Sequence, residues 1–307
     1  MKNKRMLGNI LLMITALIWG TAFVGQRVGM DYIEPITFGA ARMALAALAV
    51  WLVALIIDKV NAGKPTGMSP EEEKTYKKNT VVGGIWCGLF LTAASSFQQM
   101  GLVYTTAGKG GFITAMYMLI VPIISALLFK RKNSWLVWVA VIMGVFGMYL
   151  LSIKDEFKLG KGDALVLVCA FLFSGHILCC DYFVQKGDPI KISAMQFTVT
   201  AIISTVIALL VEEPSVEKIK SAAIPILYCG LMSGGLGFTL QIVAQKFTDP
   251  TVASLIMSLE SVFAVMAGAI LLHERMTTRE LIGCAIMFLA IVLVQIPLPG
   301  KNKEQLQ

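Results

Sequence analysis

Residues 8–20 read GNILLMITALIWG, and residues 162–174 repeat the same pattern as GDALVLVCAFLFS. The shift of 154 positions also places residues 34–35, Glu-Pro, on residues 188–189, Asp-Pro, without a gap. Self-similarity over this distance indicates a duplicated unit. Both copies are strongly apolar, and two related apolar halves are typical of membrane transporters, in which they enclose one central site.

A second match defines the extent of the two copies. Residues 87–89, Cys-Gly-Leu, correspond to residues 229–231 at a shift of 142. The shorter shift is explained by a polar loop at about 58–79, which only the first copy contains. We therefore expect one repeat over residues 1–155, with a cytoplasmic loop at about 58–79, and a second repeat over 156–307.

The composition indicates a polytopic membrane protein. The chain has 307 residues, of which 57% are hydrophobic and 15% charged, and its mean hydropathy is +0.76. Soluble domains carry about 25% charged residues. The net charge of +7 comes from short connectors between apolar runs, a placement that sets orientation in a bilayer. We expect a lipid bilayer as the partner and no nucleic acid.

Ten apolar runs are long enough to cross a membrane as helices, which need about 20 residues each. They predict an all-α membrane protein. Because each copy holds five runs, an odd number, the second copy enters the membrane from the opposite side, and the two repeats are inverted. The runs lie at roughly 7–26, 35–57, 80–103, 107–129, 134–153, 162–184, 190–211, 221–245, 250–272 and 278–296.

The distribution of Lys and Arg predicts the orientation. With the N-terminus inside, sixteen Lys and Arg residues fall in inner segments and nine in outer ones. This bias places both termini in the cytoplasm of a multi-pass protein of the cytoplasmic membrane. Almost all of the bias comes from the first copy.

Two charges lie within the apolar runs, where a charge is costly and usually functional. Glu260 lies near the middle of the ninth run and Arg42 about a third of the way into the second. Glu260 is a candidate for proton coupling or for binding a cationic group, and Arg42 for holding a substrate carboxylate through two hydrogen bonds. The alternatives are that Glu260 forms a structural ion pair with Arg42 or caps a broken helix without titrating, and that Arg42 only packs its helix against a neighbour.

Other polar side chains at helical spacing complete the candidate site. Gln99 and Gln241 correspond at the shift of 142, at the ends of two stripes of small residues. The small residues allow close helix packing, whereas an amide in hydrocarbon needs a partner or water. We therefore expect both glutamines to face a central cavity. Substrate-binding candidates from the same reasoning are Trp19, Thr114, Tyr117 and Ser258. The fourth run opens with three glycines at 108–111, which fits either a broken helix or a surface turn.

The residues that carry other chemistries are few. His176, Cys179 and Cys180 lie close together, yet zinc needs four ligands in fixed geometry and no second cluster completes such a site. The chain has only two histidines, and it has neither a Ser/His/Asp set nor a phosphate-binding loop. We expect no catalytic residue, no metal and no cofactor, and therefore no enzyme. The six cysteines all lie in apolar runs and are expected to be small buried side chains.

Several short motifs in order resemble the EamA family of the drug/metabolite transporter superfamily, over about residues 8–296. The resemblance implies ten helices in inverted five-helix repeats and alternating access to a central cavity. It also implies transport of small organic metabolites, often export of amino acids or related compounds. The motifs lie at residues 17–23, 35–46, 104–108, 258–264, 273–277 and 280–283.

These observations predict a secondary transporter, an exporter or exchanger, of small organic metabolites, with possible proton coupling through Glu260. Trp19 would pack on the substrate, and Gln99 and Gln241 would hydrogen-bond it. A passive facilitator or channel for small solutes, and a multidrug efflux protein, are the alternatives. The state of assembly is expected to be a monomer or a dimer.

Overall fold

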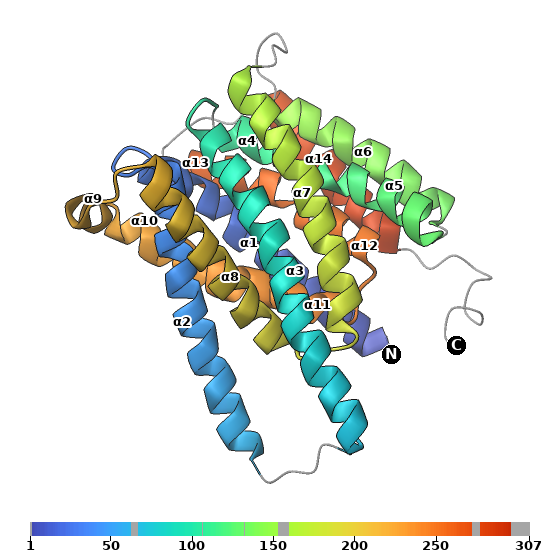
Figure 1. Ribbon diagram of the computed structural model, residues 1–307. Helices are drawn as coiled ribbons and strands as arrows, with labels where there is room; N and C mark the ends of the chain where they lie inside the picture. Colours follow the sequence, from blue (N-terminus) through green and yellow to red (C-terminus); the bar gives the residue numbers. More distant parts are fainter. Residues whose placement is uncertain are drawn as a thin grey trace.

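The computed structural model describes residues 2–62, 67–105, 107–131, 133–152, 160–271 and 277–295. Helices account for the regular structure of these residues, and no strand occurs among them (Figure 1). The all-helical expectation is therefore confirmed for the described part of the chain. Among the described residues, eight helical stretches, some of them made of two or three consecutive segments, are long and apolar enough to cross a membrane. The two remaining expected spans correspond to helices of 18 residues each, α6 and α14.

The first half contains six helical segments in five expected spans, because the fourth span is broken. The segments are α1 (Lys2–Gly29), α2 (Pro35–Asn61), α3 (Pro70–Leu102), α4 (Ala107–Thr114), α5 (Tyr117–Phe129) and α6 (Trp135–Ser152).

The second half is more interrupted, because its eighth span contains a π-helix and its ninth is also broken. The segments are α7 (Lys161–Val184), α8 (Pro189–Val211), α9 (Val216–Ser221), α10 (Ala223–Leu227), the π-helix η1 (Tyr228–Phe238), α11 (Thr239–Gln245), α12 (Pro250–Met257), α13 (Glu260–Leu271) and α14 (Thr278–Gln295).

The loop expected at about 58–79 is shorter than the sequence suggested. Helix α2 continues to Asn61 and α3 begins at Pro70, so that residue 62 and residues 67–69 form the described part of the link outside the helices. A capping box explains the early start of α3. The side chain of Ser69 accepts a hydrogen bond from the Glu72 backbone N–H, and the Glu72 carboxylate accepts one from the Ser69 N–H.

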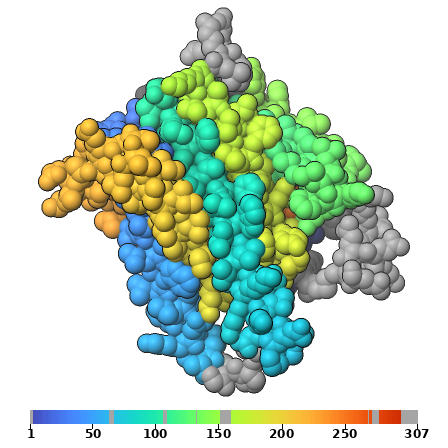
Figure 2. Space-filling model, viewed as in Figure 1, coloured from blue at the N-terminus to red at the C-terminus, as the bar shows by residue number. Residues whose placement is uncertain are grey.

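Helices from different halves make the most extensive contacts. Helix α2 packs on α8, α3 on α7, α6 on α14 and α1 on α13. On the face shown in Figure 2, α2, α8, α3 and α7 lie side by side in this order. The two halves are thus interlocked, and the space between them is at the centre of the bundle.

The outer surface of the bundle is apolar. Large side chains with more than half of their surface exposed include Leu52 on α2, Leu127 on α5 and Leu210 on α8. In water such a belt would drive aggregation, whereas hydrocarbon accepts it at no cost. Together with the eight apolar helices, this surface identifies a multi-pass membrane protein.

Candidate functional site: a central polar cavity

The two broken spans meet at the centre of the bundle. Helix α4 ends at Thr114 and α5 begins at Tyr117, while α12 ends at Met257 and α13 begins at Glu260. The first residues after the two breaks are hydrogen-bonded, because the Tyr117 hydroxyl donates to Glu260 Oε1 over 3.0 Å. Helix α5 also contacts α12, and α4 contacts α13.

The break in the fourth span lies deeper than the glycines that suggested it. Gly110 and Gly111 are inside α4, and the chain leaves helical geometry only after Thr114. Close packing explains why position 110 is a glycine, since a Cβ atom there would come within 2.5 Å of Leu102 Cδ2. Of the two interpretations given to residues 108–111, the discontinuous helix holds for the fourth span, although the break lies at residues 115–116 and not at the glycines.

A cavity opens beside the two breaks, between the halves. Its apolar wall consists of Trp19, Phe23, Tyr117, Phe173, Ile177 and Phe238. Its polar wall consists of Gln26, Arg42, Gln98, Thr114, His176, Ser233, Gln241 and Glu260. The cavity volume is about 30 Å³, which holds a water molecule but is too small for an organic solute.

Six of the eight residues selected from the sequence line this cavity. They are Trp19, Arg42, Thr114, Tyr117, Gln241 and Glu260, which come from α1, α2, α4, α5, α11 and α13.

Gln99 and Ser258 do not line the cavity. Gln99 is buried, but its Nε2 donates to the Gln26 carbonyl at 3.5 Å, and its neighbour Gln98 lines the cavity and bonds the Thr114 hydroxyl at 3.2 Å. Successive side chains on an α-helix point about 100° apart. An error of one residue in the predicted helix face therefore selects Gln99 where Gln98 faces the cavity. The hydroxyl of Ser258, which follows α12, donates back to the last turn of that helix, to the Leu255 carbonyl at 2.7 Å.

Trp19 anchors the aromatic wall deep inside the bundle. Its indole N–H donates to the Ser233 carbonyl at 3.2 Å, and its ring centroid lies 4.6 Å from that of Phe238. A Cβ atom on Gly237 would come within 2.6 Å of Trp19 Nε1. Glycine at this position of the π-helix therefore lets the indole approach the backbone.

Sequence reasoning missed several lining residues, and His176 is the most informative. It was considered only as a metal ligand. In the structure its Nε2 is 2.9 Å from Gln196 Oε1, and its ring packs edge-on against Phe173 and Phe238. The spacing of Phe173, His176 and Ile177 along one face of α7 was an available signal, because residues three and four apart share a face.

The cavity contains polar atoms without protein partners. Within the described residues, Gln26 Oε1, Arg42 Nε and Gln241 Oε1 are buried without a hydrogen bond. The guanidinium of Arg42 lies 5.8 Å from the ring centre of Phe38, and no ion pair joins it to Glu260 in the part of the chain that the structure describes. Arg42 is 3% exposed and Glu260 2%. Two opposite formal charges thus share one cavity unpaired with each other.

Known proteins resemble this chain along its whole length. The model of the EamA-like transporter family matches residues 6–153 and again 160–296. An uncharacterised transporter of Archaeoglobus fulgidus is 27% identical, over 95% of this chain and 87% of its own length.

More distant relatives share the same extent. The uncharacterised transporter YoaV of Bacillus subtilis is 23% identical, over 94% of this chain and 96% of its own. A WAT1-related chloroplast protein of Arabidopsis thaliana is 23% identical over 91% of this chain and 67% of its own. One solved crystal structure, at 17% identity, superposes with a TM-score of 0.75 over 94% of this chain and 96% of that one, which shows a common fold.

Proposed function

We propose that this chain, which belongs to the EamA-like transporter family, is a secondary transporter that carries small polar organic metabolites through its central cavity. Amino acids and related zwitterions fit the site best. The transporter works by alternating access in the cytoplasmic membrane, as an exporter or exchanger, with both termini in the cytoplasm.

The observation that carries this proposal is the presence of two opposite charges in one cavity, in the described part of the chain, without an ion pair between them. A buried charge without a counter-charge costs several kcal/mol, and the single hydrogen bond from Tyr117 to Glu260 does not supply one, so an external group of opposite charge is favourable at each site. A zwitterion supplies both. In the proposed complex Arg42 holds the carboxylate, Glu260 takes the ammonium group or a proton, and Gln26 and Gln241 accept hydrogen bonds.

The remaining predicted residues act around this pair. Trp19 packs against the apolar part of the solute, and Tyr117 positions the Glu260 carboxylate through its hydroxyl group. Thr114 contributes a hydroxyl group to the wall. Gln99 and Ser258 support the cavity from behind, because their side chains bond to backbone carbonyls.

Transport requires the cavity to open, since the present volume of about 30 Å³ admits water alone. We infer that ten helices form two inverted five-helix repeats, over residues 1–155 and 156–307, which rock about this site. The helix contacts support that inference. Exchanging the halves turns the pair α1–α13 into α7–α5, and the pair α2–η1 into α8–α3, and all four contacts occur.

Transport measurements with Glu260→Gln test the proposal. Wild-type protein in proteoliposomes is expected to take up radiolabelled amino acids faster under an imposed pH gradient, with saturation and counterflow. Glu260→Gln should lose the response to the gradient, because an amide neither binds a proton nor pairs with an ammonium group. Asp58→Asn is the control, since Asp58 is half exposed and pairs with Lys191 away from the cavity.

The outcomes separate the alternatives. Gradient-driven uptake that is unchanged in Glu260→Gln would remove the coupling role. Flux without saturation or counterflow would indicate a passive facilitator. Transport of a lipophilic cation such as ethidium, with no effect of any amino acid, would indicate multidrug efflux, for which the aromatic wall beside Glu260 is the favouring feature.

A further inference from the structure

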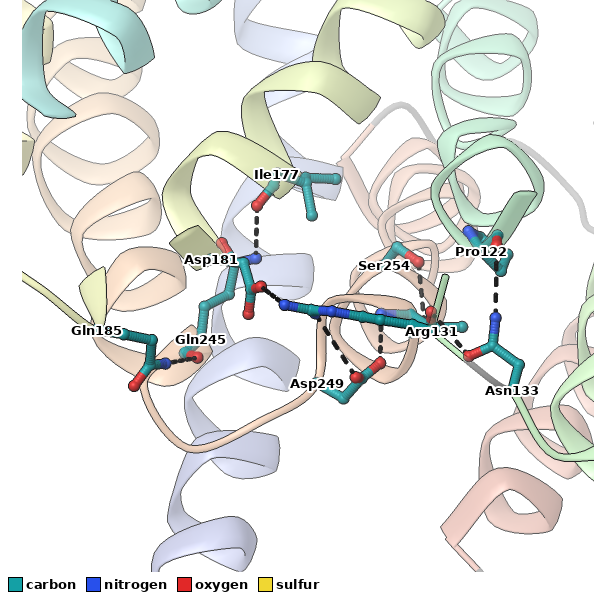
Figure 3. A network of polar contacts seen from close by, with 10 residues as sticks. Pro122, Arg131, Asn133, Ile177, Asp181, Gln185, Gln245, Asp249 and Ser254 are labelled. Carbon is teal, nitrogen blue, oxygen red and sulfur yellow. Dashed lines mark hydrogen bonds and ion pairs between the residues drawn. The ribbon is translucent and has the colours of Figure 1, made fainter. Parts of the chain in front are cut away.

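A cluster of charged and polar side chains joins the end of α7 to the start of α12 and to the connector after α5 (Figure 3). Arg131 lies between two carboxylates. Its Nη2 donates to Asp181 Oδ2 at 2.7 Å, and its Nη1 is 3.9 Å from Asp249 Oδ2. Arg131 belongs to the connector between α5 and α6, Asp181 to α7, and Asp249 caps α12. One guanidinium therefore ties together three elements.

Local backbone geometry positions Arg131 and Asp249, and burial in α7 positions Asp181. Helix α5 ends at Lys130, which has a positive φ of 53°, and the next backbone N–H, of Arg131, donates to the Ser125 carbonyl at 3.2 Å. The Asp249 carboxylate accepts from the Thr251 N–H at 2.9 Å. Asp181 is 7% exposed on α7. The cluster thus joins ordered helix ends through one close ion pair with the buried Asp181, while Asp249 is half exposed at its rim.

A second ionic contact closes the other end of the same helix. Asp163, in the first turn of α7, accepts from Lys109 Nζ at 2.6 Å and from the Thr105 hydroxyl at 2.9 Å. Lys109 belongs to α4. Asp163 and Asp181 are separated by about 27 Å along α7 at 1.5 Å per residue. The broken fourth span is therefore joined to α7 by charge at both ends, with the cavity between.

A chain of amides connects the Arg131 cluster with the cavity. Gln241, which lines the cavity, donates from Nε2 to Gln245 Oε1 at 3.1 Å. Gln245 in turn donates to the Ile177 carbonyl at 3.0 Å, and Gln185 donates to the Gln245 carbonyl at 3.3 Å. Ile177 lies one turn before Asp181 on α7. A solute that bonds the free Gln241 Oε1 thus contacts the same hydrogen-bonded bridge between α11 and α7.

We propose that the Arg131–Asp181–Asp249 cluster and the Lys109–Asp163 pair are the two gates of the transporter, and that they open one at a time. This inference rests on the proposed function, in which the cavity must reach each side in turn. Both gates are closed here, and the cavity is correspondingly small. Opening the first frees the ends of α7 and α12, and opening the second frees α4 from the start of α7.

Cysteine labelling of the full chain in detergent tests the gates without any substrate. Ser254→Cys, on α12, reports on the Arg131 side, and Ser261→Cys, on α13 beside Gly111, reports on the Lys109 side. Both serines are at most 1% exposed. Each reporter is combined with Asp181→Asn or with Asp163→Asn, and labelling by a water-soluble maleimide is timed against the chain without the reporter.

Asp181→Asn is expected to raise the labelling rate at position 254 about fivefold, with no rise at 261, and Asp163→Asn to do the reverse. Lys191→Gln, which breaks the exposed pair with Asp58, should change neither rate. Equal acceleration at both reporters would indicate general loosening and overturn the proposal, as would no change at either. If labelling follows the prediction while no amino acid is transported, the gates stand and the substrate assignment fails.

Discussion

At Gly20 the packing of α1 against α13 leaves no space for a methyl group. A Cβ atom there would lie 2.5 Å from Phe263 Cβ and 2.6 Å from the Glu260 carbonyl oxygen. Gly20→Ala is expected to destabilise the protein by about 1–3 kcal/mol, because the backbone of α13 cannot move aside without strain.

The control for Gly20 is Gly39→Ala on α2, where nothing lies within 4 Å of the added atom. Alanine there should be neutral or stabilise by up to about 1 kcal/mol, since it is the better helix former. The thermal unfolding midpoint of the purified protein in detergent measures both effects. Equal midpoints for the two variants would contradict this packing of α1 on α13.

The polar residues of the cavity were predictable by type more readily than by position. Glu260 and Arg42 stand out because charges within apolar runs are rare. Composition does not distinguish Gln98 from Gln99. Only the packing of α3 decides which of the two amides faces the cavity. His176 escaped because a lone histidine has no motif, and its role depends on neighbours from α8 and η1.

At the level of helices, the N-terminus of α2 is capped by Glu212, a residue that follows α8. Glu34 precedes α2 but makes no capping hydrogen bond. Instead Glu212, just after α8, accepts from the backbone N–H groups of Ile36 and Thr37 at 2.9 and 2.7 Å, and from the Thr37 hydroxyl at 2.7 Å. A carboxylate at a helix N-terminus is favourable, both as an acceptor and toward the helix dipole.

Glu212→Ala should therefore destabilise the protein by about 1–2 kcal/mol, with Glu212→Gln intermediate because the amide oxygen still accepts hydrogen bonds. Glu213→Ala is the matched control, since Glu213 is exposed. Denaturation followed by circular dichroism compares the three. If Glu213→Ala lost as much stability as Glu212→Ala, the effect would be one of local charge and not of helix capping.

Element boundaries agreed with the expected spans at three of the four prolines that begin helices, but α3 begins at Pro70, ten residues before the expected start at about 80. Pro35, Pro70, Pro189 and Pro250 each begin a helix, as expected for proline at the first position. The breaks at residues 115–116 and 258–259, and the π-helix at Tyr228–Phe238, carry no such signal. They arise because facing spans meet at the cavity, which a single span does not encode.

For the whole molecule, the repeat in the sequence was the strongest guide. It predicted helices in two halves, and the comparisons confirm the transporter family. It did not predict how closely the halves interlock, because the partners of α2 and α3 lie more than 50 positions away in the chain, and an apolar helix face does not specify which other helix it packs against. That choice depends on small residues such as Gly84 and Gly88, where a Cβ would meet Met195 or Val199 of α8 within 2.6 Å.

The inverted arrangement makes a prediction about sides of the membrane. The end of α2 and the start of α3 lie at one end of the bundle, and α9 lies toward the other (Figure 1). If the second repeat is inverted and the termini are cytoplasmic, a cysteine at Met68 faces the cytoplasm and one at Glu217 faces outward. An impermeant maleimide should then label Glu217→Cys on intact cells and Met68→Cys only on inside-out vesicles.

The second half alone has almost no excess of Lys and Arg on either side, so its orientation depends on the number of spans that precede it. Labelling of both cysteines from one side would mean that α2 and α8 do not run as inverted partners, and a shared cavity with alternating access would lose its structural basis.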